Sequence, residues 1–89
     1  MKKLIEDALR EINEDLESKE LENITDETPI FEILDSMAIL DLILELESRL
    51  QKKYGKYIQI ADETIMDSKK TPFKTFKALQ QFLEGKLDG

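Results

Sequence analysis

Apolar residues recur at helical spacing in three separate stretches of this 89-residue chain, and this periodicity constrains the fold more than any other feature. The first stretch covers residue 2 to about residue 18, and its apolar stripe consists of Ile5, Leu9, Ile12 and Leu16. A spacing of i, i+4, i+7 and i+11 places such side chains on one face of an α-helix. Acidic residues fill the other faces, so we predict an amphipathic first helix.

The second stretch, from Asp35 to about Lys53, carries more apolar surface than one stripe requires. On a wheel of about 100° per residue, one arc is wide enough for a core face and contains Ile39, Leu42, Ile43, Leu46 and Leu50. A neighbouring arc contains Met37, Leu40 and Leu44, with Asp41, Glu45 and Ser48 just beyond it. We predict a helix that ends near Gly55, because glycine is favoured just after a helix C-terminus.

The third stretch, "TPFKTFKALQQFLEG", contains residues typical of helix boundaries. Thr71 suits the N-cap, Pro72 the first helical position and Gly85 the end. The residues of this stretch predicted to be buried are Phe73, Phe76, Leu79 and Leu83.

Two less regular segments separate these stretches. Residues 21–34 lose the helical period, and Thr28-Pro29 favours an extended or turn conformation. This long loop is rich in apolar residues, so we expect it to lie pressed across the other elements. "DETIMD", residues 62–67, is predicted to form one or two helical turns. The predicted fold is therefore all-α: a small four-helix bundle of three long helices and one short helix, with a long first loop.

The chain length predicts a single domain over residues 1–89, with a core from about residue 4 to 84 and a short flexible C-terminal tail. So short a chain buries only about 60–65% of its unfolded surface, so a deep enclosed active site is not expected. Cysteine, histidine and tryptophan are all missing from the sequence. Disulfides, thiol nucleophiles, Cys/His zinc sites and the commonest general base are thereby excluded, and we expect no metal site.

The formal net charge of −7 argues against nucleic acid or an anionic membrane as a partner and favours a basic protein surface. The charge is uneven, because residues 1–35 carry 4 bases and 12 acids. The N-terminal stretch is amphipathic rather than continuously apolar, so we expect neither a signal peptide nor a membrane anchor. The expected protein is cytoplasmic and monomeric.

The pair Asp35-Ser36 at the start of the second helix allows two interpretations. In the first, Asp35 or Ser36 is an ordinary N-cap that satisfies free backbone N–H groups, and the helix is simply the central, most buried one. In the second, Ser36 is presented for modification, and the neighbouring apolar arc receives a partner or shelters an apolar cargo. A catalytic serine is not supported, because the chain has no histidine, no G-x-S-x-G sequence and no S-x-x-K sequence at this position.

"LDSMAILDLILELESRL" resembles the attachment site of acyl carrier proteins and related peptidyl carrier domains. The acidic first helix, the loop with Pro29 and the closing "TPFKTFKALQQFLEGKL" extend this resemblance over roughly residues 4–84. It implies a non-catalytic carrier whose Ser36 bears 4′-phosphopantetheine, added from coenzyme A by a separate phosphopantetheinyl transferase. Asp35 matches the acid before the serine. The resemblance assigns it to the cofactor site, as a helix cap and an aid to a magnesium-dependent transferase.

The same resemblance implies a partner-recognition surface on the second helix. Met37 matches the apolar residue offered to partner enzymes, while Asp41 and Glu47 match acids five and eleven residues after the serine. Glu45 adds a further acid, and Leu40 and Leu44 are expected to meet either the partner or the cargo. Such a surface attracts Lys/Arg-rich patches on transferases and ligases. The alternative is that these acids form only a solvated helix face.

Two departures distinguish the chain from carriers of general fatty-acid synthesis. Those carriers usually have glycine three residues before the serine, where this chain has Ile33, and their closing helix is more acidic than one with Lys74 and Lys77. "ILDSM" is closer to the sites of D-alanyl and other specialised carriers. We therefore expect a dedicated carrier of an acyl or aminoacyl group. The alternative from another class is an unmodified acidic helical module that binds a basic protein.

Overall fold

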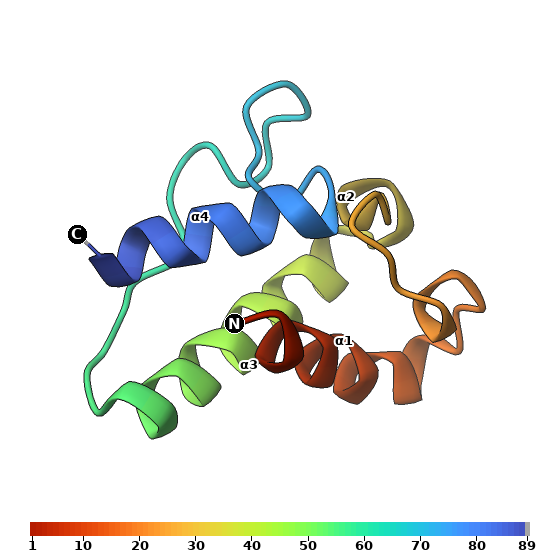
Figure 1. Cartoon of the computed structure of the whole chain (residues 1–89). Coiled ribbons are helices and arrows are strands. Elements are labelled where there is room, and N and C mark those ends of the chain that lie inside the picture. Colours follow the sequence, from red (N-terminus) through yellow and green to blue (C-terminus); the bar gives the residue numbers. More distant parts are fainter. Residues whose placement is uncertain (89) are drawn as a thin grey trace.

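The computed structural model describes residues 1–88, and every regular element in that range is helical, which confirms the all-α prediction. In chain order the elements are α1 (Lys2–Leu16), the 3₁₀ helix η1 (Glu20–Glu22), α2 (Ile30–Ile33), α3 (Ser36–Tyr54) and α4 (Phe76–Asp88). The four α-helices are compatible with a small helical bundle. Helix α1 packs along α3, and α4 lies above them in the view of Figure 1.

The apolar stripe of α1 is buried as predicted, with the exception of its last member. Ile5 and Leu9 are fully buried, whereas Leu16 is 40% exposed. The helix ends at Leu16 because Glu17 adopts a left-handed conformation (φ 55°) and donates its N–H to the Asn13 carbonyl. The Asn13 side chain closes the end by accepting from Ser18 N (2.8 Å) and donating to Ser18 O (3.1 Å).

Helix α3 divides its surface as the wheel predicts. One face is buried in the core and consists of Ala38, Ile39, Leu42, Ile43, Leu46 and Leu50. The helix ends at Tyr54, where Gly55 has a φ of 71° and donates its N–H to the Gln51 carbonyl. A positive φ favours glycine, which explains why the predicted end is correct.

The short helix lies in a different place from the predicted one. Within residues 62–67 only a turn at 63–66 is formed, and α2 in the first loop is the short helix instead. In the turn, Asp62 Oδ1 accepts hydrogen bonds from the side chain and the backbone N–H of Thr64, an arrangement that competes with helix formation. The Thr64 side-chain bond, followed by its backbone bond, lowers the pKa of the Asp62 carboxyl.

Helix α4 begins later and ends later than predicted. Thr71 is buried and accepts a hydrogen bond from Phe73 N, while the cap is Thr75, whose Oγ1 accepts from Ala78 N (3.1 Å). Gly85 does not end the helix, which continues to Asp88. Residues 85–88 are thus helical where the sequence predicts a tail, and residue 89 lies outside the described range.

The first loop is pressed across the helices, as expected from its composition. Leu21, Ile30 and Leu34 are buried in the common core, with exposed fractions of 1%, 0% and 4%. Backbone hydrogen bonds connect the loop to the region around the start of α4. They run from Phe31 N to Phe73 O, from Phe76 N to Thr28 O and from Lys77 N to Asp26 O. The loop therefore holds a fixed position immediately before α3.

None of the helices within residues 1–88 is both long enough and apolar enough to cross a bilayer.

Candidate functional site

Ser36 is the first residue of α3, and it is exposed. The preceding Asp35 is the N-cap: its backbone is extended and its Oδ1 accepts a hydrogen bond from Ala38 N (2.8 Å). Of the two possible caps, the aspartate therefore has the structural role. Within residues 1–88 the Ser36 hydroxyl takes part in no hydrogen bond and lies at the surface.

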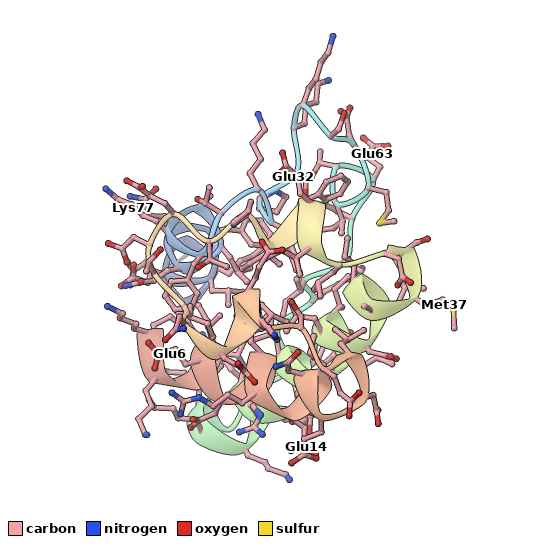
Figure 2. The ribbon with its side chains drawn as sticks, turned by 90° about the vertical axis from the view of Figure 1, so that its right-hand side faces the viewer. Glu6, Glu14, Glu32, Met37, Glu63 and Lys77 are labelled. Carbon is pink, nitrogen blue, oxygen red and sulfur yellow. The ribbon has the colours of Figure 1, made fainter. Side chains whose placement is uncertain are left out.

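Next to Ser36, α3 presents an apolar strip that consists of Met37, Leu40 and Leu44. Their exposed fractions are 71%, 52% and 65%, so the second apolar arc of the wheel is open to solvent and the helix is not buried all round. Figure 2 shows the side chain of Met37 directed away from the body of the protein. Three large apolar side chains so exposed on one short helical segment are typical of a surface that meets a partner.

The three acids predicted to recognise partners differ in their surroundings. Asp41 is exposed and forms no ion pair within residues 1–88. Glu45 is half-buried, and its Oε1 accepts a 2.7 Å hydrogen bond from Arg49 Nε. The carboxylate of Glu47 accepts a 3.0 Å hydrogen bond from the buried Ile60 N–H. Of the three, Asp41 is the carboxylate most available to a basic partner.

Glu47 has a structural role that the sequence did not indicate. Its bond to Ile60 ties the segment after α3 back onto the helix, and Ile60 itself is fully buried. A buried backbone N–H without a partner is costly, so this carboxylate satisfies a group that the irregular segment leaves free. No local pattern predicts such a contact, because the two residues are 13 positions apart and Ile60 lies outside any helix.

The start of α3 fits a covalent phosphodiester on Ser36. The hydroxyl is accessible, and converting it to an ester removes no hydrogen bond within residues 1–88. The cap is supplied by Asp35, so modification of its neighbour leaves the helix start intact. Among residues 1–88 no group of three or more acidic side chains is arranged to hold a metal ion.

No protein-family model matches the chain, and searches of curated proteins and of solved structures found no similar protein. The strongest local observation is the combination at the start of α3 of a capping aspartate, a free serine hydroxyl and an exposed apolar strip.

Proposed function

We propose that this chain is a carrier protein that holds an acyl or aminoacyl group as a thioester on a 4′-phosphopantetheine arm attached to Ser36. The observation that supports the proposal is the exposed, unbonded Ser36 hydroxyl beside the capping Asp35. The sequence has no thiol of its own, and the arm supplies one when bound. The chain is not itself an enzyme in this proposal, since loading and transfer belong to its partners.

The modification is a group transfer in which Ser36 provides the nucleophilic oxygen. A bond forms between Oγ and the phosphorus of the phosphopantetheine portion of coenzyme A. The pyrophosphate bond to adenosine 3′,5′-bisphosphate breaks, and the hydroxyl proton leaves to a base on the separate transferase. Because Asp35 Oδ1 is engaged with Ala38 N, the helix start that presents Oγ is fixed before the transferase arrives.

Partner recognition is assigned to the exposed side of α3. The apolar strip offers Met37, Leu40 and Leu44 to a transferase, ligase or acyltransferase, and Asp41 attracts a basic patch on that enzyme. Glu45 adds negative charge to this surface although it is paired with Arg49. Glu47 contributes indirectly, because its bond to Ile60 holds the segment after α3 against the helix. The Lys-containing closing helix and Ile33 favour a specialised acyl or aminoacyl cargo over general fatty-acid synthesis.

The test is the mass of the intact protein after incubation with coenzyme A, Mg²⁺ and a broad-specificity phosphopantetheinyl transferase. We expect a gain of one phosphopantetheine, lost in Ser36→Ala. Ser48→Ala is the matched control, because Ser48 is also an exposed serine on α3 and its variant should still be modified. Modification that persists in Ser36→Ala would exclude this serine as the site.

An unmodified interaction module is the second candidate, and the exposed apolar strip is the observation that favours it. In that case the strip and the acids bind a basic protein without any prosthetic arm. An unchanged mass for the unsubstituted chain, with a known carrier protein modified in the same reaction, supports this candidate instead.

A further inference from the structure

A groove of about 410 Å³ lies between the second half of α1 and the first half of α3, which we call the α1–α3 groove. Its lining consists of Glu11, Ile12, Asp15 and Leu16 from α1 and of Ala38, Asp41, Leu44 and Glu45 from α3. Four of these eight residues are acidic, four are apolar and none is basic. The groove thus combines apolar side chains with carboxylates from both helices.

We propose that the α1–α3 groove binds an amphipathic helix of a partner protein that carries Lys or Arg on both sides of an apolar stripe. Leu16 and Leu44, on opposite walls, are 40% and 65% exposed and are available to cover such a stripe. Glu11 and Asp15 on one wall and Asp41 on the other can then pair with the flanking cations. The cations on each side of the apolar stripe then face carboxylates on each wall of the groove.

A second copy of the chain is a poorer match. The other end of the same α1–α3 seam is basic, with a shallow pocket lined by Lys3, Leu4, Asp7, Arg49, Lys52 and Lys53. An antiparallel copy could place this end over the groove. However, Leu4 is only 8% exposed, so that end offers no apolar side chain to Leu16 and Leu44. Two chains of net charge −7 also repel each other.

The proposed docking does not require modification of Ser36. Asp41 lies five positions after Ser36 in the sequence, which places their side chains about 140° apart around α3. Ser36 itself is not among the residues that line the groove. The two proposals can fail separately: binding in the groove can be measured on the unmodified chain and in Ser36→Ala.

The probe is a fluorescent synthetic peptide of about 18 residues with a leucine stripe flanked on both sides by lysine. Its dissociation constant is measured by fluorescence anisotropy at several salt concentrations. We expect saturable one-to-one binding that weakens as salt rises, because exposed charges are screened. Two control peptides are used, one with the same composition in scrambled order and one with glutamate in place of lysine, and neither should bind comparably.

Substitutions locate the binding site. Leu44→Ser and Leu16→Ser should each weaken peptide binding about tenfold, whereas Tyr57→Ser, which removes a similarly exposed side chain outside the groove, should not. Glu11→Gln should weaken binding and reduce its salt dependence. Glu14→Gln is its matched control, since Glu14 is an exposed acid on α1 that does not line the groove. All five side chains substituted here are exposed, and circular dichroism checks that each variant is folded.

Three results would overturn the proposal. The first is the absence of saturable binding, and the second is equal weakening by the groove variants and their controls. The third is a concentration-dependent dimer, seen by sedimentation, that Leu44→Ser and Lys52→Glu both dissociate. That result would assign the groove to a second copy of the chain. Peptide binding that is retained in Ser36→Ala is the expected outcome, and it would show that the groove binds its partner without the phosphopantetheine arm.

Discussion

At the start of α3, two adjacent polar residues have separate roles. The Asp35 side chain turns back to accept the Ala38 N–H, which satisfies one of the free donors of the first turn. Ser36 already has helical backbone geometry, and its exposed hydroxyl is left out of the cap. The sequence predicted a cap at this pair but could not choose between its members, because serine and aspartate are almost equally good N-caps.

This division predicts unequal effects on stability. Asp35→Ala should lower the free energy of unfolding by about 0.5–2 kcal/mol through loss of the cap. Ser36→Ala should change it by less than about 0.5 kcal/mol, as is usual for an exposed residue without partners. Urea denaturation followed by circular dichroism measures both values. A larger loss for Ser36→Ala than for Asp35→Ala would contradict the assigned roles.

At the scale of elements, the sequence predicted the existence of the three long helices but misplaced the ends of α4. Thr71 and Thr75 are both suitable caps, and only the second is used. The choice depends on distant partners, because Phe76 N and Lys77 N donate to carbonyls of the first loop. The position of α2 also depends on a long-range bond, from Phe31 N to Phe73 O, which no local pattern contains.

Gly55, which follows the last residue of α3, and Gly85, which lies within α4, should respond in opposite ways to substitution by alanine. Gly85 lies within α4 with open space around it, so Gly85→Ala should raise the free energy of unfolding by about 0.5–1 kcal/mol through better helix propensity. Gly55 has a φ of 71°, so Gly55→Ala should lower it by about 1 kcal/mol. Thermal unfolding of both variants provides the measurement. If Gly85→Ala lowered the melting temperature, the extension of α4 to Asp88 would be in doubt.

At the scale of the whole molecule, α3 separates the core from the candidate site. The face that holds Leu46 packs against the rest of the protein, whereas the apolar strip and Ser36 face outward. Helical periodicity predicted the core face and revealed the second apolar arc, but it left open whether that arc is buried or exposed. Two features could not be predicted from the sequence: the hydrogen bond from Ile60 N to Glu47 and the groove between α1 and α3. Both depend on how segments distant in the sequence pack together.

Two leucines on α3 test this division directly. Leu46 is fully buried and Leu44 is 65% exposed, although they lie only two residues apart. Leu46→Ala should lower the free energy of unfolding by about 2–5 kcal/mol through lost burial and a cavity. Leu44→Ala should change it by about 0.5 kcal/mol or less. Urea denaturation measures the pair, and similar losses for both would mean that α3 is rotated about its axis relative to this structure.

The exposure of Met37 also makes this surface vulnerable to oxidants. The chain has no cysteine, and its thioethers at Met37 and Met66 are 71% and 48% exposed. Peroxide converts such a side chain to a polar sulfoxide. Oxidation would therefore first add a polar oxygen to the apolar strip next to Ser36, and a methionine sulfoxide reductase could restore the Met37 side chain.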